Sequence, residues 1–358
     1  MQTLRDRYFK LFPKKRCAVI FVVYMALFIT QGLTVTATQK PDHKYEYNTA
    51  TVVLLAETAK LLTSIVIYVC QNSWEDFKVE VKQRTSLFGY YFVPAVLYCL
   101  YNNLQFTSLS WFDPTSYFVL MQFRVVVTGV LFQFIFKKQL TRMQWLSLIL
   151  LTIGCTVQRL QENDIGKLSL NVNIYLILIL MQILSSCFAG VYTEFLLKTL
   201  GRDTDVMVQN VFLYLDSIFC NLVLLTYNGQ VFTFLSYQNL QPVLSFKVIY
   251  IIVNQTCIGI VVSYFLRYLN SILKSFASAL EIVFTAVLAM LFFGVPIGFN
   301  TIISICLIFV ATYLYSANPV NNTSAGSREP SKDNGGPCNS SANPKLCRPR
   351  NISSSDKV

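Results

Sequence analysis

Six ionisable side chains stand inside long apolar stretches of this sequence: Glu57, Lys60, Arg124, Asp216, Lys274 and Glu281. A charge at the centre of a membrane helix costs about 2.5–3.5 kcal/mol to insert, so such residues are candidates for function. Glu57 and Lys60 lie three residues apart on one helical face, where they either neutralise each other or shape a cavity. Arg124 has no acidic neighbour on its own face, and therefore requires Asp216, Glu281 or the anion of a ligand.

The polar residues near these charges indicate the kind of ligand. Arg124 and Lys274 suit an anion, because a guanidinium presents a planar fork to phosphate oxygens. Amides can read the edge of a base or sugar, and tyrosine rings can stack on a base, although tyrosines also gather at membrane interfaces. The candidates of these types are Tyr98, Asn102, Tyr117, Asn210, Tyr214 and Ser263. Together they predict a ligand with a phosphate group and a flat or hydroxylated part.

The composition excludes several classes of protein. Apolar residues make up 54% of the 358 residues and charged residues 13%, whereas a soluble domain carries about 25% charge. A soluble enzyme is therefore excluded. The single histidine, His43, excludes a histidine-rich metal site, and the ten cysteines contain no CxxC pair. We expect neither a metal nor a cofactor.

The elements that must position these residues are membrane helices, each needing about 20 apolar residues. The apolar runs predict an all-α membrane protein with ten spans, at roughly 17–37, 50–70, 87–108, 114–136, 143–160, 173–197, 206–226, 247–266, 271–294 and 298–316. Lys and Arg concentrate in alternate loops, in the basic N-terminus (1–16) and in the tail, which predicts cytosolic termini. This topology accounts for the net charge of +11, so no nucleic-acid partner is expected. The tail (317–358) is rich in Ser, Asn, Pro and Gly, and is expected to be disordered.

Two of these spans share a pattern. Tyr117 is followed seven residues later by Arg124 and four later by Thr128; Lys274 is followed in the same spacing by Glu281 and Thr285. The pattern predicts two five-helix repeats, 17–160 and 173–316. Because five is odd, the second repeat must enter the bilayer in the opposite sense. Inverted repeats are typical of secondary transporters, which bind their substrate near the midplane between the repeats.

Several motifs resemble a known family. They are Glu57-Thr-Ala-Lys60-Leu-Leu, Tyr101-Asn-Asn-Leu-Gln-Phe106, Asp113-Pro-Thr-Ser-Tyr117, Gly190-Val-Tyr-Thr-Glu194, Gln209-Asn-Val-Phe-Leu-Tyr214 and the stretch from Asn270 to Phe276. Across residues 17–316 the chain is similar to the nucleotide-sugar transporters of the Golgi and endoplasmic reticulum, within the group that carries UDP-galactose, UDP-N-acetylglucosamine and CMP-sialic acid.

The resemblance implies a ten-helix drug/metabolite-transporter fold that exchanges a cytosolic nucleotide sugar for a lumenal nucleoside monophosphate. Family positions match at Glu57, Lys60, Tyr98, Asn102, Tyr117, Arg124, Asn210, Tyr214, Ser263 and Lys274. Arg124 stands where the CMP-sialic acid carriers have lysine, Asp216 where they have serine, and Glu281 where they have a small apolar residue. Two added carboxylates would disfavour a sugar that itself carries a carboxylate, so a UDP-hexose is favoured.

We therefore expect a carrier and not an enzyme, which imports UDP-galactose or UDP-N-acetylglucosamine into the Golgi lumen in exchange for UMP. Its partners would be these nucleotides and the lipid bilayer, with a homodimer or a complex with glycosyltransferases as further expectations. Location in the endoplasmic reticulum remains open. So do two other functions: exchange of CMP-sialic acid for CMP, and a membrane scaffold for glycosyltransferases that transports nothing.

Overall fold

A computed structural model describes residues 11–12, 14–38, 49–111, 114–159, 174–227, 229, 241, 244–293 and 298–320. Every regular element in these ranges is helical. The helices are α2 (Lys15–Thr38), α3 (Thr49–Gln71), α4 (Trp74–Gln83), α5 (Thr85–Trp111), α6 (Pro114–Met121), α7 (Arg124–Phe136), α8 (Arg142–Arg159), α9 (Ile174–Phe195), the π-helix η1 (Leu196–Leu200), α10 (Val206–Tyr227), α12 (Phe246–Tyr268), α13 (Ser271–Phe293) and α14 (Phe299–Ala317). His43 and the predicted disordered tail lie outside the described residues.

The long apolar stretches do form long helices. In the described ranges, eight segments are long and apolar enough to cross a membrane: Lys15–Thr34, Thr51–Gln71, Tyr117–Phe136, Leu176–Leu200, Val206–Tyr227, Phe246–Tyr268, Ser271–Leu288 and Phe299–Ala317. The protein is thus a multi-pass, all-α membrane protein. Helices α5 and α8 coincide with two further predicted spans but are not among the eight. The count of ten spans therefore stays a prediction.

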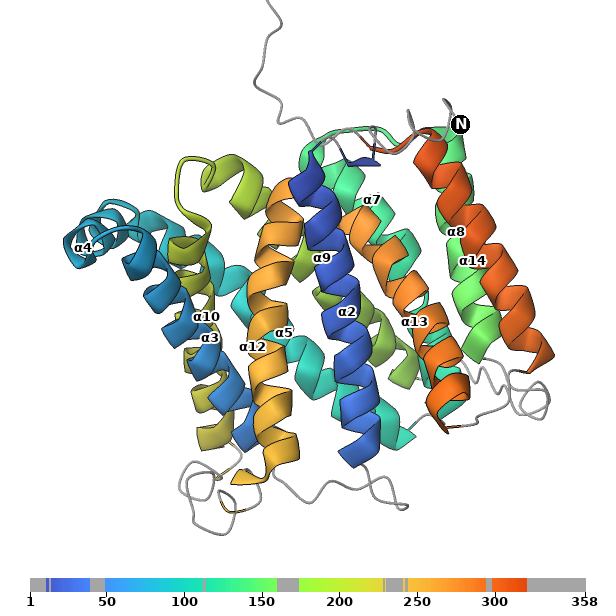
Figure 1. Ribbon diagram of the computed structural model, residues 1–358, viewed down its shortest axis with the longest axis horizontal. Helices are drawn as coiled ribbons and strands as arrows, with labels where there is room; N and C mark the ends of the chain where they lie inside the picture. The colour runs from blue at the N-terminus through green and yellow to red at the C-terminus, as the bar shows by residue number, and fades with distance from the viewer. Residues whose placement is uncertain are drawn as a thin grey trace, which may run out of the picture. The chain divides into compact units, whose positions relative to one another are not determined.

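Two local features differ from the expectation. The predicted span 114–136 is not one helix, because a turn at Gln122 and Phe123 separates α6 from α7. The basic loop after α3 contains the short helix α4, which begins with a capping box between Ser73 and Asp76. Phe77 is the residue that α4 buries, whereas Trp74 and Val79 are exposed. Figure 1 shows α4 at the edge of the bundle, and it contacts α3 and α10.

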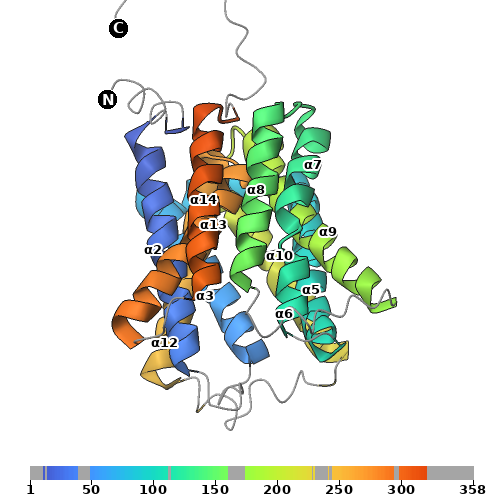
Figure 2. The ribbon, with the colours of Figure 1, turned by 90° about the vertical axis from the view of Figure 1, so that its right-hand side faces the viewer.

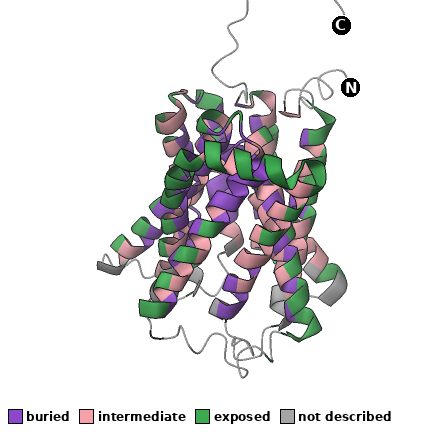
Figure 3. Cartoon of the chain, turned by 90° about the vertical axis from the view of Figure 1, so that its left-hand side faces the viewer, coloured by how far each residue is buried: buried purple, intermediate pink, exposed green. Residues whose placement is uncertain are grey.

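The helices pack in a bundle in which α9, like its neighbours, buries one face and exposes the other. Helix α9 contacts α5 and α7, α10 contacts α3 and α5, and α12 contacts α2 and α3. Helices α8 and α14 lie side by side along one edge (Figures 1 and 2). The inward faces are buried and the outward faces carry exposed apolar side chains, among them Val22, Leu62 and Phe134 (Figure 3). Exposed apolar side chains of this kind are what lipid-facing helices present.

Interhelical hydrogen bonds fix the end of the bundle near α4. The hydroxyl of Tyr91 on α5 donates to Oε1 of Gln209 on α10 over 2.7 Å. Glu80 on α4 accepts from the hydroxyl of Tyr68 at 2.5 Å and from the backbone N–H of Asp205 at 2.9 Å. Helix α5 contains Pro94. Beyond Pro94, the same helix carries Tyr98 and Asn102 toward the site described next.

Candidate functional site

Two neighbouring pockets share one wall residue, Lys274 of α13. The larger has a volume of about 270 Å³ and lies among α3, α5, α9, α10, α12 and α13. Its polar lining consists of Glu57, Lys60, Tyr98, Asn102, Thr193, Tyr214, Ser217, Asn221, Ser263 and Lys274. The smaller has a volume of about 110 Å³ and lies among α7, α8, α9 and α13 and the α6–α7 turn. Its polar lining consists of Gln122, Arg124, Thr128, Ser186, Cys187, Ser271, Lys274, Ser275 and Ser278.

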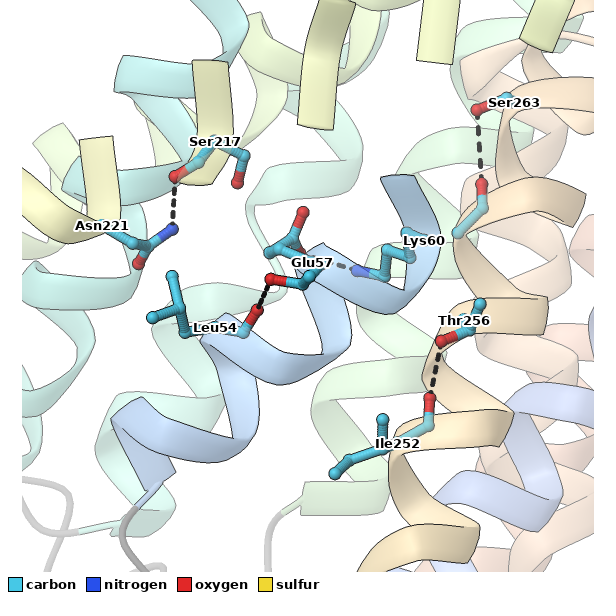
Figure 4. Close-up of polar contacts among 10 residues, drawn as sticks. Leu54, Glu57, Lys60, Ser217, Asn221, Ile252, Thr256 and Ser263 are labelled. Atoms are coloured by element: carbon cyan, nitrogen blue, oxygen red, sulfur yellow. Dashed lines mark hydrogen bonds and ion pairs between the residues drawn. The ribbon is translucent and has the colours of Figure 1, made fainter. Parts of the chain in front are cut away.

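In the larger pocket, helix α3 places the predicted pair on one face. The Lys60 ammonium lies 2.7 Å from Oε1 of Glu57, and both side chains are only 14% exposed. Figure 4 shows this pair between α10, which carries Ser217 and Asn221, and α12, which carries Ser263. The ammonium also lies 5.7 Å from the centre of the Tyr214 ring, within the range of a cation–π contact. Glu57 leaves the second oxygen of its carboxylate for other donors, because the pair uses Oε1.

Gly259 on α12 makes this arrangement possible. A Cβ atom at this position would lie 2.8 Å from the Tyr214 hydroxyl and 2.9 Å from Cδ of Lys60. Both distances are shorter than a van der Waals contact, so the absence of a side chain lets Lys60 and Tyr214 approach α12. The carbonyl of Gly259 accepts a hydrogen bond of 3.2 Å from Ser263.

In the smaller pocket, the two predicted cations come from different helices. Arg124 is the first residue of α7, and Lys274 lies on the first turn of α13. The Arg124 carbonyl accepts from Thr128 at 2.7 Å and from the Cys187 thiol at 3.3 Å, which ties α7 to α9. Three serines, Ser271, Ser275 and Ser278, follow the same face of α13. Cations and hydroxyl donors therefore converge here, a lining suited to phosphate oxygens.

The other predicted residues lie elsewhere. Tyr117 is 1% exposed, and its hydroxyl accepts a hydrogen bond of 2.7 Å from Nε2 of Gln182. It therefore packs against α9, outside both pockets. Asn210 and Asp216 are each 2% exposed, and neither Nδ2 of Asn210 nor Oδ2 of Asp216 has a hydrogen-bond partner in the described part of the chain. Glu281 is half-buried and lines neither pocket.

Several lining residues were not predicted: Thr193, Ser217, Asn221, Gly259, Ser271 and Ser275. Ser217 and Asn221 lie three and seven residues after Tyr214, so helical spacing from that tyrosine could have found them. Across the described ranges, no cluster of three metal-ligating side chains is present.

Comparison with known proteins gives the family. The family model "Nucleotide-sugar transporter" matches residues 10–316. The chain is 47% identical over 346 residues to the "UDP-galactose transporter senju" of Drosophila melanogaster, which covers 87% of this chain and 89% of the relative. It is 30% identical over 277 residues to the "CMP-sialic acid transporter 2" of Oryza sativa subsp. indica, covering 76% of each chain.

A solved crystal structure has the same fold, with a TM-score of 0.63 and 11% identity over 85% of this chain and 97% of that one. The expectation of a carrier in place of an enzyme is confirmed by the family model and by the relatives, which are named as transporters. The matched residues 10–316 include both pockets and every helix from α2 to α13. The chain belongs to the nucleotide-sugar transporter family.

Proposed function

We propose that this protein imports a UDP-hexose, either UDP-galactose or UDP-N-acetylglucosamine, into the Golgi lumen in exchange for UMP. The 47% identity to a relative named as a UDP-galactose transporter supports this substrate. The proposal includes ten spans in two inverted five-helix repeats with cytosolic termini. The observation that carries it is the position of Lys274, which borders both pockets and lies beside Arg124.

The two pockets divide the ligand by chemistry. Arg124, Lys274 and the α13 serines bind the phosphates in the smaller pocket. Tyr98, Asn102, Tyr214 and Ser263 offer rings, amides and hydroxyls to the nucleoside and sugar in the larger one. Lys274 borders both pockets, which suits a ligand whose diphosphate lies between its nucleoside and its sugar. Tyr117 and Asn210 line neither pocket in this conformation, so a contact with the nucleoside requires another state of the carrier.

Exchange follows from the charges. An empty cavity holds the cations Arg124 and Lys274 without an anion, and moving such a cavity through an occluded state is costly in a low dielectric. Bound phosphate compensates both cations, so the loaded carrier changes its orientation faster than the empty one. The protein then returns by carrying the nucleoside monophosphate outward.

The competing substrate, CMP-sialic acid, carries a carboxylate on its sugar. Asp216 and Glu281 would repel it in a conformation where they face the cavity, although neither lines the pockets here. We therefore expect Asp216→Ser to raise the rate for CMP-sialic acid relative to UDP-galactose.

An uptake assay tests the proposal. Purified protein in liposomes preloaded with UMP or with CMP is offered a panel of nucleotide sugars. Uptake of a UDP-hexose that depends on UMP supports the proposal, whereas uptake of CMP-sialic acid against CMP overturns the substrate. A scaffold would take up nothing, and its function in cells would survive a charge substitution at Arg124.

A further inference from the structure

Glu194, near the end of α9, holds the beginning of α13. Its side chain is 1% exposed. Its Oε2 accepts two hydrogen bonds from Ser271, one of 2.7 Å from the backbone N–H and one of 2.6 Å from the hydroxyl. Its Oε1 accepts 2.7 Å from the ammonium of Lys198. A carboxylate at a helix N-terminus satisfies an N–H without a partner in the helix and interacts favourably with the helix dipole. We call Glu194, Lys198, Leu269 and Ser271 the Glu194 latch.

Further bonds fix the turn between α12 and α13 on the same segment. Lys198 donates to the carbonyl of Leu269 in this turn. Arg267, at the end of α12, donates to the carbonyls of Leu197, Gly201 and Arg202. These carbonyls belong to η1 and to the turn after it, where the π-helix departs from the regular hydrogen-bond ladder. The latch is thus a polar junction between α9 and the beginning of α13.

The latch lies directly at the pockets. Ser271 lines the smaller pocket together with Gly190 and Val191 of α9, and Thr193, next to Glu194, lines the larger. Lys274 follows Ser271 by three residues on α13, so it moves with the turn that Glu194 holds. The junction therefore joins two of the helices that line the smaller pocket. Lys198, Arg202 and Arg267 belong to the basic loops expected in the cytosol.

We propose that Glu194 is a gating and positioning residue, whose bonds to Ser271 close the cytosolic end of the cavity and hold Lys274 in place. Opening that end separates α9 from α13 and breaks both bonds, together with the bond from Lys198 to the Leu269 carbonyl, while the ion pair between Glu194 and Lys198 on the same helical segment remains. The bonds to Ser271 thus exist in one state only, and such a difference is what biases a two-state equilibrium. This inference rests on the proposed function for the direction of opening.

The test measures access to the cavity from the cytosolic side. Cys187 lines the smaller pocket and is 5% exposed, so it reports opening. In a chain that keeps Cys187 as its sole cysteine, a membrane-impermeant thiol reagent is added to sealed vesicles whose cytosolic face is outward. We expect Glu194→Gln to raise the labelling rate about tenfold, the factor for one weakened charge-assisted hydrogen bond. Ser271→Ala, which keeps the backbone N–H, raises it about threefold, and Glu194→Asp restores a rate near that of the parent chain.

The matched control is Glu75→Gln, which breaks an exposed i,i+3 pair with Lys78 on α4 and leaves the rate unchanged. An unchanged rate in both Glu194→Gln and Ser271→Ala overturns the gate, even where exchange falls. Labelling does not require a known substrate. Faster labelling in a protein that exchanges no nucleotide therefore refutes the proposed function and leaves the gate standing.

Discussion

Replacing Gly259 with alanine tests whether the approach of α3 and α10 to α12 shapes the binding pocket. The new Cβ would lie 2.8 Å from the hydroxyl of Tyr214, and 2.9 and 3.0 Å from Cδ and Cε of Lys60. All three contacts involve the outer parts of side chains and not backbone. Lys60 and Tyr214 can therefore retreat, and the strain appears in the pocket more than in the fold.

The magnitude follows from the cost of overpacking. Inserting a methyl group into a filled space costs about 1–3 kcal/mol. Since the displaced groups line the larger pocket, we assign about 1–2 kcal/mol of this to lost binding, which corresponds to a rise of about 5–30-fold in KM. The assay is the uptake of UDP-galactose into liposomes preloaded with UMP, with the melting temperature of the purified protein measured in parallel.

The control is Gly89→Ala on α5, where a Cβ would meet nothing within 4 Å. This variant should keep its KM and gain a little stability, since alanine favours helix over glycine by about 1 kcal/mol. Two results would refute the reasoning. An unchanged KM in Gly259→Ala means that Lys60 and Tyr214 do not contact the ligand, and a collapse of its melting temperature means that the close approach serves packing of the whole bundle.

Three further predictions concern charged residues. Lys274→Ala should lower exchange at least about 30-fold, the usual cost of removing one partner of a buried charge pair, whereas Lys274→Arg keeps measurable exchange; full exchange in the alanine variant would exclude the phosphate role. Lys60→Met should lower the melting temperature, because it leaves Glu57 buried and unpaired at 14% exposure, and adding Glu57→Gln should restore part of the loss; additive losses would contradict the pairing. Burial, and then the neighbouring Lys198, lower the pKa of Lys138 from its usual 10.5, so the folded state binds this proton less tightly than the unfolded state does. Lys138→Met should therefore stabilise the protein at pH 7, and this gain should shrink as the pH rises past the lowered pKa toward 10.5; a gain that grows with pH would show the opposite sign.

Hydropathy predicted the long helices closely, because each must fill the thickness of a bilayer. The expected span 206–226 is α10, Val206–Tyr227, in the structure. The same reasoning missed α4, since a short helix with few apolar residues resembles a charged loop. It also missed the turn at Gln122 and Phe123, because the mean hydropathy stays high across it and neither glycine nor proline stands at the break.

Ionisable residues in apolar helices could be singled out from the sequence, and two of them, Lys60 and Lys274, line a pocket in the structure; their part in binding stays a prediction. The division of the candidate residues between two pockets could not be predicted from the sequence, because it depends on how α9 and α13 are rotated about their axes. Nothing in the sequence distinguishes Cys187 from the other nine cysteines, yet it lines the smaller pocket. Gly259 carried no polar signal at all, and only the approach of Tyr214 and Lys60 reveals its role.

Pro94 divides α5 into two parts that are attached differently. Proline donates no N–H, so the carbonyl of Tyr90 loses its usual helical partner and the helix bends more readily at this point. On one side of Pro94, Tyr91 is anchored to Gln209. On the other side, Tyr98 and Asn102 border the cavity. Pro94 therefore places a point of easier bending in α5 between the residue anchored to α10 and the two side chains that border the cavity.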